Sequence, residues 1–155
     1  GGETAADNLA RLHDDVIARA PDLVVWQVGT NDAFRKVPLD RFRAAVRQGV
    51  EEIRAVGAEL ILMNPQFYPG ETKVADYGAY VAAVNELGLS LGIPVLDRHR
   101  TMQSWIATGH FQVAEVLSTD GLHLRDASYR CLAEMLADMM LTPEPRRETA
   151  SVPAR

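Results

Sequence analysis

The chain has 155 residues, 47% of them hydrophobic, and a formal net charge of −5 at pH 7. This is the length of one domain, and the apolar fraction is enough for a buried core. An acidic balance without a long Lys/Arg run argues against nucleic acid as the main partner, because basic faces bind phosphates. No segment approaches the roughly 18 uninterrupted apolar residues of a membrane span. The single cysteine, Cys131, excludes an internal disulfide and leaves the localisation open.

Helix and strand patterns alternate from the first residues onward. Apolar residues at Leu9, Leu12 and Val16 predict a helix over residues 7–20, which Pro21 ends. Residues 23–28 are almost entirely apolar and include β-branched side chains, which is typical of a strand buried on both faces of a parallel sheet. The next apolar stripe predicts a second helix that ends near Gly57, with the core-facing residues Leu39, Phe42, Val46, Val50 and Ile53.

The second half of the chain repeats this alternation. Residues 60–63 predict a strand, and a third helix follows it and ends at Gly92, with the apolar residues Tyr77, Tyr80, Val84, Leu87 and Leu91. Residues 93–96 predict a short third strand and residues 101–108 a helix. A last helix is expected with Asp126 as its N-cap and the stripe Tyr129, Leu132, Leu136 and Met139.

The alternation of the two patterns predicts the α/β class with a parallel sheet, in one domain over residues 1–141. Residues 142–155 contain three prolines and no apolar period, so we expect a flexible tail there.

Polar residues follow the first predicted strand, at the sheet edge where ligands bind in open parallel sheets. The strand ends on Gly-Thr-Asn-Asp at residues 29–32, in which Asn31 offers a side-chain NH₂ that can bind a developing oxyanion. Asn and Asp after a strand are also ordinary turn formers, so this motif alone leaves both interpretations open.

The second polar motif is Asp-Gly-Leu-His at residues 120–123. A turn of this spacing can place the Asp120 carboxylate against Nδ1 of His123 and leave Nε2 as a general base near neutral pH. Asp-Gly is also a common turn, and His123 alone could be a capping or surface residue. Together, at carboxyl-side loops of one sheet, the two motifs favour a reaction centre over two unrelated turns.

Other candidates carry less weight. Phe67 and Tyr68 follow the second strand, where they either line an acyl or leaving-group pocket or belong to a proline-stiffened surface loop. A metal site that combines Asp120, His123 and His110 is conceivable, but the sequence has no tight ligand cluster, and neither a metal nor a cofactor is expected. The remaining histidines lack a partner at a useful spacing and are interpreted as surface or loop residues: His13, His99 and His110.

With these motifs the chain resembles the SGNH, or GDSL-type, hydrolases, a family of serine esterases and lipases. Residues 29–32 match its Gly-x-Asn-Asp block and residues 120–123 its Asp-x-x-His block. A weaker match at residues 2–4, Gly-Glu-Thr, corresponds to a block that begins with glycine just before a helix. The resemblance implies a flavodoxin-like three-layer sandwich and hydrolysis of a small-molecule ester.

The resemblance also implies a role for each matching residue. Asp120 and His123 would belong to a Ser-His-Asp triad, and Asn31 and the Gly2 N–H would be oxyanion donors. Asp32 is expected to anchor its loop rather than to take part in the chemistry. The motifs do not select among lipid, carbohydrate, aryl and thioester substrates.

The family block that carries the nucleophile, Gly-Asp-Ser, is absent. No serine follows an apolar strand and a glycine; the serines are Ser90, Ser104, Ser118, Ser128 and Ser151. We therefore expect the chain to be the C-terminal part of a hydrolase whose first, central strand and nucleophile lie outside this sequence. The alternative is a non-catalytic α/β module that keeps the fold and binds a ligand. An upstream strand ending in Gly-Asp-Ser would distinguish the two.

Overall fold

The computed structural model describes residues 1–142, and its three strands form one parallel sheet. The strands β1 (Leu23–Gln27), β2 (Glu59–Met63) and β3 (Val95–Leu96) lie in the order β1-β2-β3. All five residues of β1 pair with β2, whereas β3 pairs with β2 at only two positions. The predicted third strand is shortened at its start, because Pro94 has no N–H to donate to a neighbour. The predicted α/β class with a parallel sheet is confirmed.

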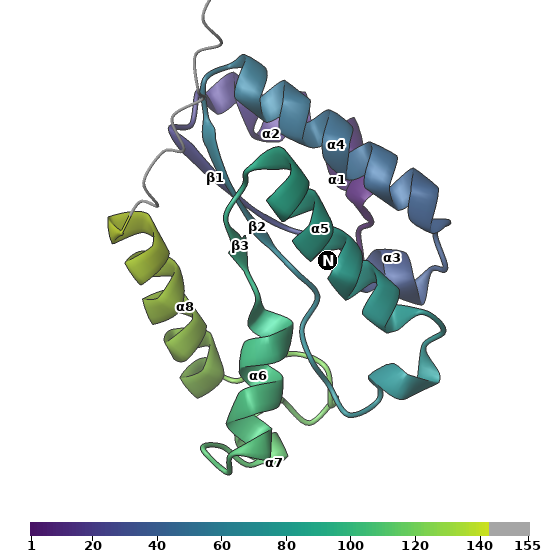
Figure 1. Ribbon diagram of the computed structural model, residues 1–155, viewed down its shortest axis with the longest axis vertical. Coiled ribbons are helices and arrows are strands. Elements are labelled where there is room, and N and C mark those ends of the chain that lie inside the picture. Colours follow the sequence, from purple (N-terminus) through teal and green to yellow (C-terminus); the bar gives the residue numbers. More distant parts are fainter. Residues whose placement is uncertain (143–155) are drawn as a thin grey trace, which may run out of the picture.

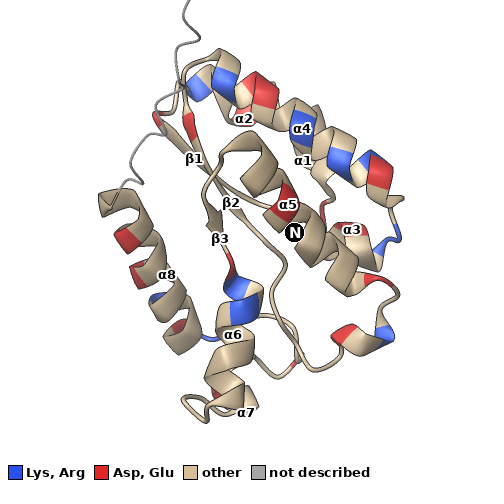
Figure 2. Cartoon of the chain, in the orientation of Figure 1, with Lys and Arg blue, Asp and Glu red and all other residues tan. Residues whose placement is uncertain are grey.

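Helices connect the strands and cover the sheet. The long helices α4 (Leu39–Ala55) and α5 (Tyr77–Leu91) pack on one face, where both contact β2. Figure 1 shows the strands between these two helices and α8 (Asp126–Leu141), so the layers follow the expected order of helix, sheet and helix. Figure 2 shows acidic and basic residues mixed along α4. Among residues 1–142, no helix has the length and apolar character needed to cross a membrane.

The two longer strands differ in how well they are covered. β2 is buried on both faces, since three successive side chains are 6%, 4% and 0% exposed: Leu60, Ile61 and Leu62. On β1, Trp26 is buried, and it packs so closely under α4 that a Cβ at Gly49 would lie 2.4 Å from its ring. Val25 and Gln27 point to the other face and are exposed. Within the described part of the chain, β1 therefore has one paired edge and one partly open face.

The first predicted helix is broken into three pieces. They are α1 (Ala5–Ala10), α2 (Leu12–Asp15) and the 3₁₀ helix η1 (Ile17–Arg19). The helix also starts earlier than predicted, because Thr4 and Asp7 form a capping box: the Thr4 hydroxyl accepts the Asp7 N–H at 3.2 Å, and the Thr4 N–H donates to Asp7 Oδ2 at 2.9 Å.

Several short elements were not predicted. The helix α3 (Thr30–Phe34) begins directly after β1, where a loop was expected, and η2 (Glu71–Lys73) and α7 (Val113–Val116) lie in other predicted loops. The helix α6 (Arg98–Ala107) begins earlier than residue 101 because the Asp97 side chain caps it.

The last helix ends the described structure. Asp126 is the first helical residue of α8 rather than its N-cap, and Thr142 is its C-cap. The rest of the predicted tail, residues 143–155, lies outside the described residues.

Candidate active site

Asp120 and His123 lie on the turn between α7 and α8. The two arms of the turn are joined by an antiparallel bridge between the buried residues Leu117 and Leu124. At the tip, Asp120 Oδ2 lies 2.6 Å from His123 Nδ1, and Asp120 Oδ1 accepts the backbone N–H of His123 at 2.9 Å. The histidine side chain is 69% exposed. The structure therefore brings the predicted pair into direct contact, with the imidazole open to solvent.

Hydrogen bonds within the turn keep the Asp120 carboxylate ionised. The Ser118 hydroxyl donates to Asp120 Oδ1 at 2.6 Å, and the Leu122 N–H donates to the same oxygen at 2.9 Å. The Ser118 bond, followed by those from Leu122 and His123, holds the pKa of Asp120 well below its ordinary value. An ionised carboxylate only accepts, so the proton shared with His123 sits on Nδ1. The basic position of the ring is then Nε2, the one suited to a general base.

Asn31 lies in the first turn of α3, directly after β1. The chain turns at Gly29, where φ is +100° and a Cβ would lie 2.9 Å from the Pro65 side chain, so only glycine fits. The Asn31 Nδ2 atom donates to the Glu3 carbonyl oxygen at 2.9 Å. An amide nitrogen carries two hydrogens, and the second has no acceptor among residues 1–142. Asn31 can therefore donate to an oxygen atom of a ligand.

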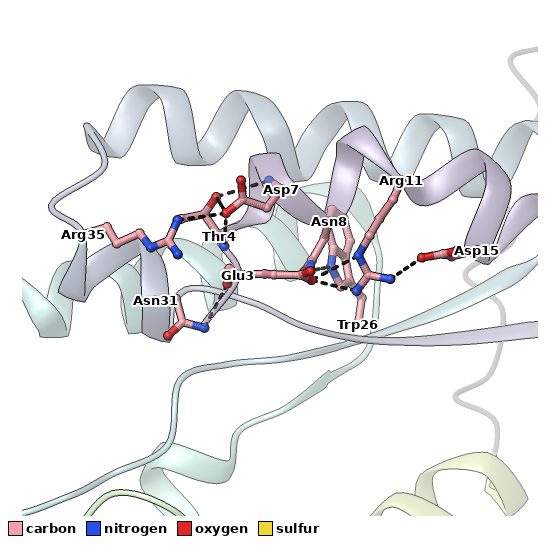
Figure 3. Close-up of polar contacts among 9 residues, drawn as sticks. All are labelled: Glu3, Thr4, Asp7, Asn8, Arg11, Asp15, Trp26, Asn31 and Arg35. Carbon is pink, nitrogen blue, oxygen red and sulfur yellow. Dashed lines mark hydrogen bonds and ion pairs between the residues drawn. The ribbon is translucent and has the colours of Figure 1, made fainter. Parts of the chain in front are cut away.

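Glu3 links the segment before α1 to two places: its backbone carbonyl accepts the bond from Asn31, and its side chain reaches Asn8 and Arg11 (Figure 3). The Glu3 carboxylate accepts a hydrogen bond from Asn8 at 2.7 Å, and bonds from Nε and Nη2 of Arg11 at 3.1 and 2.7 Å. Gly2, the preceding residue, has φ +79°, and within the described part of the chain its amide donates to no acceptor. The second predicted oxyanion donor thus lies one residue from the Glu3–Asn31 contact.

A small hollow of about 20 Å³ opens beside Asn31. That space admits about one water molecule, or a single oxygen atom of a bound group. It suits the oxygen of a carbonyl rather than a whole acyl chain. The residues that form its wall are Glu3, Gln27, Val28, Gly29, Thr30 and Asn31.

Asp32 is buried beneath the site, at 1% exposure. Its two carboxylate oxygens accept the N–H of Ala5 at 3.1 and 3.2 Å. Ala5 is the first residue of α1, so Asp32 satisfies an amide that the helix itself leaves unpaired. Burial raises the pKa of Asp32, and the bond from Ala5 opposes that rise. Asp32 joins α1 to α3, in agreement with the anchoring role predicted for it.

The loop after β2 is packed into the protein rather than exposed. Tyr68 is 8% exposed, and its ring centroid lies 5.9 Å from that of Phe34 and 5.5 Å from that of Tyr77. Phe67 is half-buried, with its ring 5.8 Å from the His99 ring. Other residues form the hollow beside Asn31, so a pocket role for Phe67 and Tyr68 stays a prediction.

Another histidine–carboxylate pair joins this loop to α6, and the sequence interpretation missed it. His99 Nε2 lies 2.8 Å from Glu71 Oε2, and the two side chains are only 15% and 17% exposed. The expected surface position of His99 is therefore wrong. The partners are 28 residues apart, so no local spacing reveals them. His13 and His110 are exposed, as expected.

Arg98 was also missed, although it lies only two residues after the third strand. It is 3% exposed, and burial lowers its pKa to about 10. Its Nε donates to the Asn64 carbonyl oxygen at 2.7 Å, while Nη1 and Nη2 donate to Oε1 of Gln27 at 3.0 Å and of Gln66 at 2.7 Å. A charged residue at a strand end was the only signal in the sequence.

The candidate residues form two clusters at the carboxyl end of the sheet. One contains Gly2 and Asn31, next to the end of β1, and the other is the turn with Asp120 and His123. Figure 1 draws this turn at the same end of the sheet as α6. No hydrogen bond among residues 1–142 joins the two clusters. In the same range, no three His, Cys, Asp or Glu side chains are grouped as metal ligands.

Residues 1–143 match the model of a family described as the non-GDSL lipase-like family. The chain is 32% identical over 101 residues to an acetylxylan esterase of Geobacillus stearothermophilus, a match that covers 55% of this chain and 46% of that protein. It is 26% identical to the esterase TesA of Pseudomonas aeruginosa, covering 79% and 57% of the two chains. With an arylesterase of Vibrio mimicus it shares 24% identity, in a match that covers 90% of this chain and 66% of that protein. The chain therefore spans about half to two thirds of the length of these relatives.

Solved structures show the same fold. A lipase/acylhydrolase from Enterococcus faecalis superposes with a TM-score of 0.75 at 27% identity, covering 89% of this chain and 71% of that one. A catalytic mutant of the acetylxylan esterase Axe2 from Geobacillus stearothermophilus gives a TM-score of 0.76 at 24% identity, covering 89% and 68%. The second likeness shows the fold alone. Together with the family match, these structures confirm the resemblance to SGNH hydrolases.

Proposed function

The chain belongs to the non-GDSL lipase-like family, and from this membership we propose that it supplies the general base and the oxyanion donors of a carboxylic ester hydrolase. The observation that carries the proposal is the 2.6 Å contact between Asp120 Oδ2 and His123 Nδ1 on an exposed turn, which leaves Nε2 of His123 free and accessible. The three curated relatives, all esterases, support it. In this proposal the nucleophilic serine comes from a segment outside these 155 residues.

The Geobacillus esterase supports the roles of Asp120 and His123, and the upstream position of the serine, through the spacing of its own catalytic residues. Its catalytic mutants replace an aspartate, a histidine three positions later, and a serine near the amino terminus. Asp120 and His123 have the same spacing. In that enzyme more residues lie between the serine and the aspartate than precede Asp120 here, which is why we place the nucleophile upstream.

The proposed reaction has two steps. His123 Nε2 takes the proton of the serine hydroxyl as its oxygen attacks the ester carbonyl carbon, and gives that proton to the alcohol when the ester C–O bond breaks. Water then attacks the acyl-enzyme in the same way, and His123 returns the proton to the serine as the acid leaves. Asp120 stabilises the imidazolium in both steps, while Asn31 and the Gly2 N–H donate to the carbonyl oxygen as it becomes negative.

The test uses the complete gene product that contains this chain, an aryl acetate and a serine-directed phosphonate. We expect hydrolysis that the phosphonate stops, with the adduct, located by mass spectrometry, on a serine upstream of Gly1 at the end of an apolar strand. Because the family is described as non-GDSL, the neighbours of that serine need not read Gly-Asp-Ser-Leu. Residues 1–155 expressed alone should neither hydrolyse the ester nor take up the phosphonate.

Two results would contradict the proposal. Hydrolysis by residues 1–155 alone, with an adduct on one of their own serines, would refute the upstream nucleophile. A complete gene product that binds esters without turning them over would instead support the alternative, a non-catalytic α/β module that uses the same loops for binding.

A further inference from the structure

We propose that Arg98 is a positioning residue for the turn that holds Asn31, and that it acts through Gln66 on Thr30. Oε1 of Gln66 accepts both Arg98 Nη2 at 2.7 Å and the Thr30 hydroxyl at 2.9 Å. Thr30 directly precedes Asn31 in the first turn of α3. The inference rests on the proposed function, because the turn it concerns is the one that carries the proposed oxyanion donor.

Arg98 ties together the carboxyl ends of all three strands. It lies two residues after β3, and its guanidinium donates to Gln27, the last residue of β1, and to the carbonyl of Asn64, the first residue after β2. Its third acceptor, Gln66, lies two residues further along the same loop. The five donors of a guanidinium stand in a fixed planar fork, so the bonds hold their acceptors in one relative geometry. Lysine also has three donors, but they rotate about a single atom and do not fix three acceptors in one plane.

Stability alone does not explain a cation at this position. Arg98 is 3% exposed, and among residues 1–142 no carboxylate lies within ion-pair distance of it. A buried charge without a counter-ion is costly, and an apolar side chain of similar volume often serves a core as well or better. Figure 2 shows basic residues in the first turn of α6, beside the end of β3. The geometry that the guanidinium imposes on its acceptors gives a reason for keeping the charge there.

The same side chain sets the orientation of Gln27. A guanidinium only donates, so the oxygen of the Gln27 amide faces Arg98 and its NH₂ is directed away. Gln27 also forms part of the wall of the hollow beside Asn31. Arg98 therefore influences two walls of that hollow, Thr30 through Gln66 and Gln27 directly.

The first test is steady-state kinetics on the complete gene product with Arg98→Lys. Lysine keeps the charge but donates from one point, so it cannot hold three acceptors in one geometry. We expect kcat to fall about 10- to 100-fold, as a small misplacement of a catalytic group does, with KM changed less than about 2-fold. Arg100→Met is the matched control, an exposed arginine on the same helix, and it should leave both constants unchanged.

A double-mutant cycle tests the route through Gln66. Thr30→Val removes the hydroxyl while keeping the shape of the side chain. If Arg98 acts on Thr30, the double variant Arg98→Lys/Thr30→Val should lose no more of kcat than the worse single variant. Losses that multiply would overturn the proposed route. If Arg98→Lys does not fold, Thr30→Val alone must still lower kcat with KM unchanged, and a normal kcat would overturn the proposal.

The last measurement does not depend on turnover. In ¹⁵N-labelled complete gene product, Arg98→Lys should shift the NH₂ resonances of Asn31, and Arg100→Met should not. If the wild type hydrolyses no ester, the proposed function fails, and these resonances still decide whether Arg98 positions Asn31. Arg98→Lys could instead lower the melting temperature and leave the Asn31 signals unchanged. Arg98 would then only stabilise the fold, and the inference would be wrong.

Discussion

Two of the histidine–carboxylate pairs among residues 1–142 share their chemistry and differ in their surroundings. Asp120 and His123 are three residues apart on an exposed turn, with side chains 49% and 69% exposed. Glu71 and His99 are 28 residues apart, with side chains 17% and 15% exposed. The first pair uses Nδ1 of the imidazole, and the second uses Nε2.

The difference indicates which features qualify a histidine for the proposed role of general base. A general base needs an unoccupied nitrogen that a substrate can reach, and Nε2 of His123 meets that requirement. In the buried pair the corresponding nitrogen is already bound to Glu71, and the ring packs near Phe67 and Tyr77, at 5.8 and 6.4 Å. A contact between a histidine and a carboxylate is therefore not sufficient evidence for a catalytic site.

The largest expected effect is the loss of activity on removing the exposed imidazole. In the complete gene product, His123→Ala should lower kcat for an aryl acetate about 10⁴-fold or more, because no other group takes the serine proton. Circular dichroism should show a folded protein, since the side chain is 69% exposed. His99→Gln is the matched control and should keep kcat within about 10-fold of the wild type.

Near-normal turnover in His123→Ala would contradict the assignment of His123 as the general base. Equal losses in the two variants, both folded, would erase the distinction between the pairs.

The second largest effect is expected from removing the side-chain amide of Asn31, which contacts neither histidine. Asn31→Ala should lower kcat about 10²- to 10³-fold with little change in KM, because an oxyanion donor acts mainly in the transition state. The measurement is a full substrate-saturation curve for the complete gene product. A variant in which only KM rises would make Asn31 a substrate contact or a plain turn residue.

Local patterns predicted much of the fold and the exposed pair. The strand and helix repeats of the buried residues are local, and they placed α4, β2 and α5 within a few residues. The Asp120–His123 contact was predictable because its spacing, three residues across a turn, is itself local. The Gly29 turn was likewise visible as a glycine at the end of an apolar run.

Contacts between distant residues could not be predicted in this way. His99 pairs with Glu71, and Arg98 with Gln27 across 71 residues of sequence, so both depend on where the whole fold places each segment. The break of the first helix near Arg11 was also missed, because apolar residues continue through it at helical spacing. Periodicity reports which side chains face a core, and it does not report which polar partners meet there.

A smaller effect, on stability rather than on activity, is expected from changing the buried pair. Glu71→Gln replaces a buried charged partner of His99, and we expect the free energy of unfolding to fall by about 1–3 kcal/mol, as for a buried polar group that loses its bond. The activity per folded molecule should stay within a few-fold of the wild type. Urea denaturation of the complete gene product measures the first quantity and an aryl-ester assay the second.

Glu86→Gln is the control for this variant. Glu86 is 61% exposed in its ion pair with Arg43, and such surface pairs contribute about 0–1 kcal/mol. Equal destabilisation by the two substitutions would remove the contrast between a buried and an exposed carboxylate. A loss of activity without a loss of stability in Glu71→Gln would place the buried pair in the reaction.

The smallest expected effect is that of Ser118→Ala on the exposed pair. The Ser118 hydroxyl is the first cause of the low pKa of Asp120, so its loss should raise that pKa toward the ordinary value of about 3.9. A carboxyl whose pKa is lowered by folding contributes stability that is present above its unfolded pKa and is lost as the pH falls through its lower folded pKa. The variant should therefore show a weaker dependence of stability on pH below about pH 4 than the wild type. At pH 7 its kcat should change only a few-fold, because the bonds from His123 and Leu122 still hold the carboxylate.

Urea denaturation at pH 3 and pH 7 measures the change in the pH dependence of stability. The control is Ser104→Ala, which removes the hydroxyl of an exposed serine on α6. If Ser118→Ala and the wild type lose the same stability between these two pH values, the Ser118 hydroxyl does not keep Asp120 ionised, and the preference of His123 for a proton on Nδ1 must rest on the contact with Asp120 and the backbone amides alone.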